Sequence, residues 1–141
     1  MKLFWLKIGL LIVLSVAGTR SALALDGALV IANPGVRADS LSANVLKDIY
    51  TARTKYWDDG QAIILVVLPD QTDAALEQAS GMDANQFKTF WERLAFSGRG
   101  AEPERTGSTA ALLAFVASTK GAMALVPADT KLTGVKVIEI R

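Results

Sequence analysis

The sequence predicts an α/β domain in which a central, mostly parallel β-sheet is flanked by helices. Short apolar runs that end at turn residues alternate with segments whose apolar residues recur at helical spacing. Several of the helical segments begin with side chains suited to capping a helix N-terminus. Strands that alternate with helices are typical of layered α/β domains, because a crossover helix returns the chain to start the next parallel strand.

Four apolar runs are predicted to form strands. The run over 63–68 is continuous and ends at Pro69, which is typical of a strand buried on both faces. The run over 28–31 ends in the turn sequence Asn33-Pro34-Gly35. The last run alternates irregularly, and we expect it at an edge of the sheet. The four predicted strands cover residues 28–31, 63–68, 122–126 and 135–140.

Four further segments are predicted to be helices. Ser42 is placed to cap the first, and Leu41 with Leu46 can form a hydrophobic staple across its start. Asp83 and Gln86 form the capping box of the third, whose apolar residues recur at i, i+3, i+4 and i+7. The predicted helices cover residues 41–51, 72–80, 83–97 and 108–121, and a polar loop is expected over 101–106.

The first 24 residues predict a secretory signal peptide. Lys2 and Lys7 form a positive start, Ile8–Gly18 is apolar, and Ala22-Leu23-Ala24 is a small-x-small cleavage site. We expect cleavage after Ala24, which leaves residues 25–141 as one domain in the periplasm. The alternative is an uncleaved membrane anchor, although the apolar run is shorter than the roughly 20 residues that a membrane span needs.

Composition narrows the function classes. Three of the 15 basic residues (Lys2, Lys7 and Arg20) lie in the expected signal peptide, which leaves 12 basic and 14 acidic residues, a net charge of −2. No basic footprint for nucleic acid remains. Histidine and cysteine are both absent, which excludes Ser-His-Asp and Cys-His nucleophiles and thiolate or imidazole metal ligands. We expect no catalytic residue, no cofactor and no metal.

A set of ordered motifs resembles the phosphate-type periplasmic solute-binding proteins, the substrate-binding components of phosphate ABC transporters. The resemblance runs over most of residues 28–128, and it implies a single lobe of the type 2 periplasmic-binding-protein fold and a phosphate-like ligand. Its motifs are Ile31–Gly35, the helix over 41–51 followed by Trp57-Asp58-Asp59-Gly60, Asp83–Gly100 with Phe96-Ser97-Gly98-Arg99-Gly100, and Gly107–Val126.

The sequence departs from this family at its ligand loop. The family follows the strand that matches 63–68 with Arg-x-x-Gly-Ser-Gly-Thr, whereas this chain has Leu68-Pro69-Asp70-Gln71-Thr72-Asp73. The arginine and the glycines are missing, and the carboxylates of Asp70 and Asp73 would repel an anion by roughly 4 kcal/mol at 4 Å and an effective dielectric constant of 20. Full members of the family also have two lobes that close on the ligand, whereas this chain is about one lobe.

Four residues are candidate anion ligands. Arg99 lies in a glycine-flanked loop and offers a planar fork of donors. Thr72 has the one hydroxyl group that remains in the altered ligand loop. Ser108 and Thr109 follow Gly107 at the start of a predicted helix. Each has a purely structural alternative, a helix cap for the three hydroxyls and a solvated turn for Arg99. Arg105 is considered only as a second arginine on the rim near Arg99.

The leading hypothesis is therefore a periplasmic, non-catalytic binding protein with weak affinity for phosphate or another oxyanion. The alternative is an accessory or protein-interaction module that kept the fold and lost the pocket. Its partner would be a second copy in a homodimer or another periplasmic or membrane protein.

Overall fold

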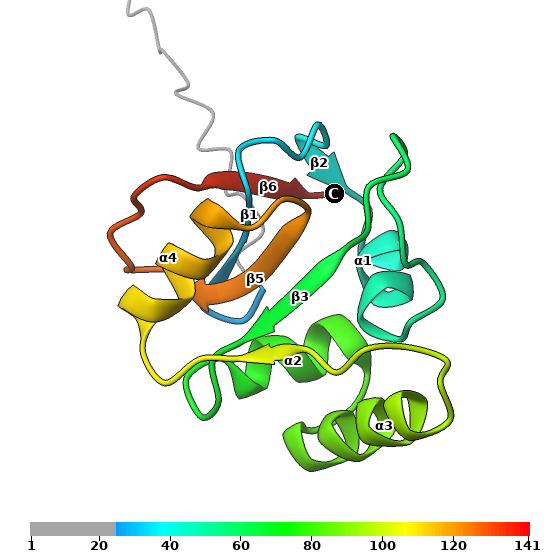
Figure 1. Ribbon diagram of the computed structural model, residues 1–141. Coiled ribbons are helices and arrows are strands. Elements are labelled where there is room, and N and C mark those ends of the chain that lie inside the picture. The colour runs from blue at the N-terminus through cyan, green and yellow to red at the C-terminus, as the bar shows by residue number, and fades with distance from the viewer. Residues whose placement is uncertain (1–24) are drawn as a thin grey trace, which may run out of the picture.

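The computed structural model describes residues 25–141 (Figure 1). The expected signal peptide lies outside these residues. Residues 25–141 form six strands and four helices in an interleaved order. They are β1 (Ala28–Ala32), β2 (Ser40–Leu41), α1 (Ala43–Tyr50), β3 (Ile64–Val67), α2 (Asp73–Ser80), α3 (Ala84–Phe96), β4 (Glu104–Arg105), α4 (Thr109–Ser118), β5 (Ala122–Pro127) and β6 (Lys136–Ile140).

The strands form one sheet in the order β2-β6-β1-β5-β3-β4. β3 runs parallel to β4 and β5, and β2 runs parallel to β6. β1 is antiparallel to both of its neighbours, with Ala28 opposite Pro127 and Val30 opposite Ile138. Five of the six strands therefore point the same way, which confirms the prediction of a mostly parallel sheet.

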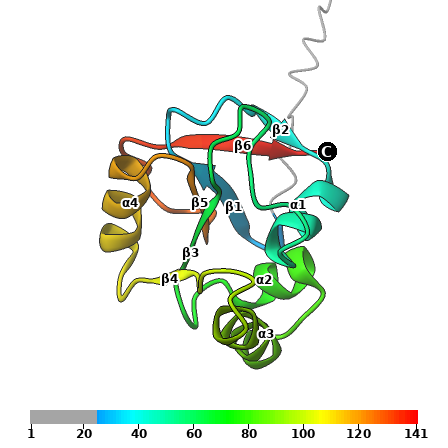
Figure 2. The same cartoon turned by 45° about the vertical axis from the view of Figure 1, so that its right-hand side comes forward.

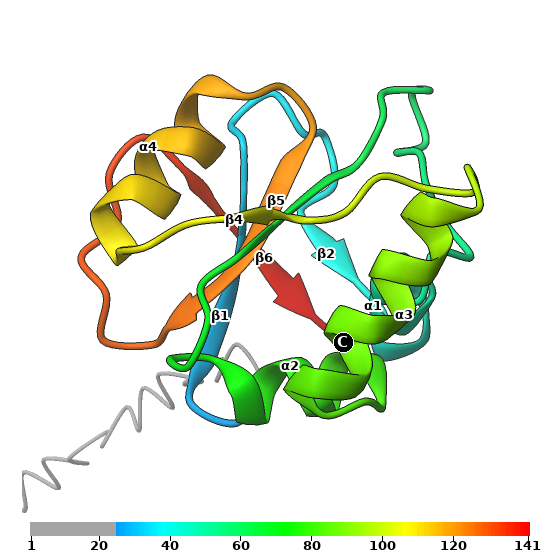
Figure 3. The same cartoon turned by 60° about the horizontal axis from the view of Figure 1, so that its bottom comes forward.

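Helices cover both faces of the sheet. Helices α1, α2 and α3 pack on one face, and α4 packs on the other (Figures 2 and 3). The larger core contains the aromatic side chains of Tyr50, Trp57, Phe87 and Trp91, all of which are buried. The smaller core lies under α4, where Leu112 and Val116 are completely buried against β3 and β5. This arrangement confirms the predicted α/β class.

Three of the predicted helix starts have the expected caps. The Val45 amide donates to the Ser42 hydroxyl (3.1 Å), and the Ala111 amide donates to the Ser108 hydroxyl (3.1 Å). Asp83 and Gln86 form the reciprocal capping box, with bonds of 2.8 and 3.0 Å. Each cap satisfies an amide that the first helical turn leaves without an intrahelical partner.

The structure corrects the prediction at the sheet edges. The strand expected at an edge, β6, lies between β1 and β2, because Ser40 and Leu41 form a two-residue strand beside it. The loop expected over 101–106 contains β4, which pairs with the end of β3. Within residues 25–141, no helix is both long enough and apolar enough to cross a membrane.

Candidate functional site

A small pocket lies where β3 ends and α2 begins. We call it the β3–α2 pocket; its volume is about 140 Å³, and it is enclosed by the loop after β3, the first turns of α2 and α3, and β4. Ligands of open α/β sheets bind at the carboxyl ends of the strands, where helix N-termini present free amides. The position of the pocket is therefore that of a ligand site. Its polar lining residues are Asp70, Thr72, Asp73, Asn85, Lys88 and Arg105.

The loop that enters α2 is shaped by its own carboxylates. Asp70 has a φ of 71°, a left-handed backbone that Asp tolerates better than most residues. Its amide donates to Oδ1 of Asp73 at 3.3 Å. Thr72 occupies the N-cap position and is buried, but its hydroxyl makes no capping hydrogen bond. The Asp73 carboxylate thus accepts from a loop amide that would otherwise be open to an external anion.

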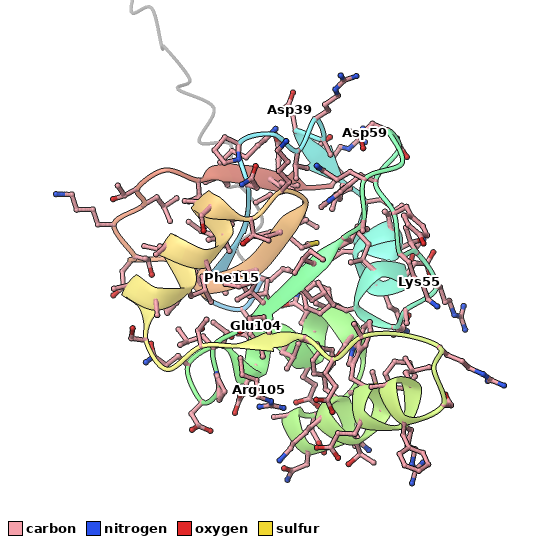
Figure 4. All side chains as sticks on the ribbon, in the orientation of Figure 1. Asp39, Lys55, Asp59, Glu104, Arg105 and Phe115 are labelled. Carbon is pink, nitrogen blue, oxygen red and sulfur yellow. The ribbon has the colours of Figure 1, made fainter. Side chains whose placement is uncertain are left out.

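Two cationic side chains reach the same pocket from other elements. Lys88 comes from α3 and Arg105 from β4, and Figure 4 shows Arg105 pointing from β4 toward α2 and α3. The Lys88 ammonium also lies 3.9 Å from the Glu92 carboxylate, and both side chains are about half exposed. The formal charges of Lys88 and Arg105 balance those of Asp70 and Asp73, so the pocket has donors but no net positive charge.

Ser108 and Thr109 lie close to this loop along the sheet edge but belong to the other layer. The Thr106 amide and hydroxyl both donate to the Val67 carbonyl oxygen at 3.0 Å, which joins the β4–α4 loop to the end of β3. From there α4 turns to the opposite face of the sheet. The Ser108 hydroxyl caps α4, and neither Ser108 nor Thr109 lines the β3–α2 pocket.

Arg99 lies apart from Thr72. It follows α3 on the approach to β4, whereas Thr72 follows the end of β3, and β4 runs parallel to β3. Arg99 lines a different groove along α3, and its carbonyl oxygen accepts from Nζ of Lys55. Arg105 lines the β3–α2 pocket and does not share the groove of Arg99. The four predicted ligands are therefore distributed over three places.

Lys88 and Asn85 were not among the predicted ligands, and Arg105, which was considered only as a second arginine near Arg99, lines the β3–α2 pocket instead. The spacing of Ala84, Asn85, Phe87 and Lys88 shows that they share one side of a helix. Nothing in that spacing reveals that this side faces the start of α2. The two-residue strand β4 carries no periodic pattern, so the sequence gives no signal that places Arg105 beside Thr72.

Three solved structures that this chain resembles in fold are phosphate-transport proteins. The structure of a phosphate ABC transporter substrate-binding protein with bound phosphate from Clostridium perfringens superposes with a TM-score of 0.63 at 16% identity. An ABC-type phosphate transport receptor from Vibrio cholerae gives 0.56 at 17% identity, and PstS from Borrelia burgdorferi gives 0.52 at 8% identity. No family model and no curated protein sequence matches the chain.

The match extends over most of this chain and less than half of each relative. It covers 81% of this chain and 44% of the Clostridium perfringens protein, and 82% of this chain and 47% of the Borrelia burgdorferi protein. Residues of this chain thus form a mixed α/β fold that matches a fragment of the phosphate-binding-protein fold. At these identities the likeness establishes the fold.

Proposed function

We propose that residues 25–141 form an exported, single-lobe, non-catalytic binding module for a small oxyanion of the phosphate class. The observation that carries this proposal is the fold shared with a phosphate-bound substrate-binding protein, together with a pocket at the start of α2. In this proposal the oxyanion binds to Thr72, Lys88 and Arg105. The helix dipole and the free amides in the first turn of α2 also favour a negative charge there. The expected signal peptide supports a periplasmic location.

The proposed binding is weak because of the charges that surround the pocket. Asp70 and Asp73 oppose the two cations, and the Asp73 carboxylate already accepts from the loop amide. A site that buries most of a ligand typically needs walls on all sides, whereas this pocket is formed by one lobe. A dissociation constant in the millimolar range, about −4 kcal/mol, fits this balance.

Isothermal titration with phosphate and with sulfate tests the proposal directly. We expect heat at millimolar phosphate, and the affinity should fall at least about fivefold in Arg105→Ala, because one charge at 4 Å is worth about 1 kcal/mol in a water-like dielectric. Arg99→Ala is the matched control, since Arg99 lies outside the pocket. An absence of heat at millimolar ligand, or an equal loss in both variants, refutes the proposed site.

Ser108 and Thr109 remain predicted anion ligands. A second titration series tests whether the anion binds near them or in the β3–α2 pocket. Thr109→Val removes a hydroxyl at the start of α4 while keeping the shape of the side chain. In our proposal this change leaves phosphate affinity unaltered, whereas Thr72→Val weakens it. The opposite pattern would move the site to the start of α4.

The second candidate function is an interaction module that has lost its ligand. The internal bond from the Asp70 amide to the Asp73 carboxylate favours it, because a side chain of the chain itself takes the place of an external anion. Light scattering and phosphate titration on the same preparation distinguish the candidates. An oligomer or complex that gives no heat on titration with phosphate supports the interaction module. A monomer that binds phosphate contradicts it.

A further inference from the structure

A wide groove runs along the outward side of α3 and adjoins the β3–α2 pocket at Asn85, which lines both. Its volume is about 860 Å³, and its apolar floor is formed by Met82, Phe90 and Leu94, which are only partly buried where they pack on the larger core. The groove extends from the turn before α3 to the loop after it. Figure 1 shows α3 on the outside of the molecule, beyond α2. We call this feature the α3 groove.

Phe96 presents an exposed apolar side chain next to the α3 groove, although it is not one of the residues that line the groove. Its side chain is 96% exposed, although Phe is usually buried. At 100° per residue, Phe96 projects on the same side of α3 as Asn85 and Thr89, both of which line the groove. An exposed aromatic residue beside an apolar groove is typical of a protein interaction site.

The charged side chains that line the α3 groove are all positive. Among residues 25–141, Arg93 and Arg99 line it, and no Asp or Glu does. Lys55, which donates to the carbonyl oxygen of Arg99, adds a third cation at the same end. Glu92 projects on the same side of α3 as Phe96 without lining the groove, and its carboxylate lies 3.9 Å from the Lys88 ammonium one turn earlier. This local positive charge contrasts with the net charge of −2 over residues 25–141.

We propose that the α3 groove binds an acidic amphipathic helix of a partner protein. The groove follows the length of a 13-residue helix, about 20 Å, and a second helix packs naturally along such a ridge. Apolar residues of the partner at i, i+3, i+4 and i+7 would contact Met82, Phe90 and Leu94. Carboxylates flanking that stripe would face Arg93 and Arg99, which sets the orientation of the partner.

A second copy of this chain does not supply such a helix from its described residues. Two copies of α3 packed in parallel would bring Arg93 and Arg99 of each against those of the other, and in an antiparallel pair the lining of neither groove offers a carboxylate to these arginines. Helix α2 is acidic, but its leucine is buried against its own core. Helix α4 carries no charged residue at all. A flat anionic bilayer would leave the concave floor of the groove unfilled, so a helix fits it better.

Photo-crosslinking in living cells tests this proposal with the full chain. A photo-crosslinking amino acid replaces Phe96, and the same amino acid in place of Val137, 40% exposed on β6, is the matched control. We expect a crosslink from position 96 and none from position 137 to the same partner. Mass spectrometry of the joined peptide should identify an acidic segment with apolar residues at helical spacing.

Reversing the charges of Arg93 and Arg99 tests whether the α3 groove itself binds the crosslinked partner. Arg93→Glu combined with Arg99→Glu should reduce the crosslink at least fivefold, whereas Lys120→Glu combined with Lys131→Glu, two exposed positions elsewhere, should leave it unchanged. Arg99→Glu alone, outside the helix, keeps the test decisive if the double variant does not fold. The proposal is overturned by a crosslink to a second copy, to lipid or to a segment without acidic residues. It is equally overturned by no crosslink or by one that is insensitive to the reversal. None of these outcomes depends on phosphate binding.

Discussion

The indole Nε1 of Trp57 donates a hydrogen bond to the carbonyl oxygen of Gly121 at 3.0 Å, across 64 residues of sequence. The Ile64 amide donates to the same carbonyl oxygen at 3.1 Å. The backbone of Gly121 also approaches the Ala62 carbonyl so closely that a Cβ at Gly121 would lie 2.1 Å from that oxygen. These contacts join the turn before β3 to the start of β5, and they hold the two parallel central strands in register.

Gly121→Ala is expected to destabilise the protein by at least about 3 kcal/mol. The substitution combines a left-handed backbone, φ 81°, with a steric clash against main-chain atoms that cannot rotate away. Gly60→Ala is the matched control, because Gly60 has a similar φ of 85° and open space around its Cβ position. Its expected cost is about 1 kcal/mol. Urea denaturation of both variants measures the difference, and equal losses would contradict the close approach at Gly121.

Tyr50→Phe is expected to leave stability unchanged or to raise it by about 1 kcal/mol. The Tyr50 hydroxyl is buried between α1 and α3 and has no hydrogen-bond partner among the described residues. A phenylalanine keeps the ring contact with Phe87, with centroids 6.1 Å apart, and removes a polar group that is buried at a cost. Thermal denaturation checks this, and a clear loss of stability would show that the hydroxyl is bonded in solution.

The same tyrosine predicts a loss of stability in alkali. Burial raises the pKa of the Tyr50 phenol well above its ordinary value of 10. Above pH 10 the folded state therefore keeps the Tyr50 proton while the unfolded state releases it. Below pH 10 both states hold the proton, and the contribution of Tyr50 to the free energy of unfolding is fully present. Stability should fall above pH 10 by about 1.4 kcal/mol per pH unit. Tyr50→Phe should remove that component, and Tyr56→Phe, at a 62% exposed position, should retain it.

Asn33→Asp is expected to cost about 3 kcal/mol. The Asn33 Nδ2 donates to the carbonyl oxygens of Val116 (2.9 Å) and Ala117 (3.1 Å), and its Oδ1 accepts from the Gly35 amide (2.8 Å). An aspartate loses both donors and places a negative charge at the negative end of α4. Asn44→Asp, near the exposed N-terminus of α1, is the control and should be neutral or slightly stabilising. Thermal denaturation of the two variants measures the contrast, and similar melting temperatures would contradict it.

Asp73→Asn is expected to strengthen phosphate binding about fivefold. Asparagine keeps an oxygen that can accept from the Asp70 amide, but it removes a negative charge from the β3–α2 pocket. One such charge is worth about 1 kcal/mol at 4 Å in a water-like dielectric. Calorimetric titration compares this variant with Asp58→Asn, which lies outside the pocket. An unchanged affinity in Asp73→Asn would contradict the proposed ligand position.

Local sequence determined the elements and most of their boundaries. The caps at Ser42, Asp83 and Ser108 involve atoms three residues apart, so the sequence alone predicts them. Apolar runs likewise predicted the four longer strands. The run over 63–68 is continuous, because burial on both faces leaves no polar positions, whereas the last strand contains Lys136 and Glu139. The α/β class follows from the order of these elements, and the four longer strands and all four helices were confirmed.

Only the tertiary structure decided which side chains meet. Strands β2 and β4 have two residues each, too few for any periodic pattern, and they exist because longer neighbours supply their hydrogen-bond partners. The pairing of β4 with β3 brings Arg105 to Thr72, and the same pairing leaves Arg99 beside Lys55. The exposure of Phe96 depends on which side of α3 faces the core, a choice made by Phe87 and Trp91 packing on Tyr50. Such contacts join residues tens of positions apart, so spacing along the chain determined the elements and packing in space determined the site.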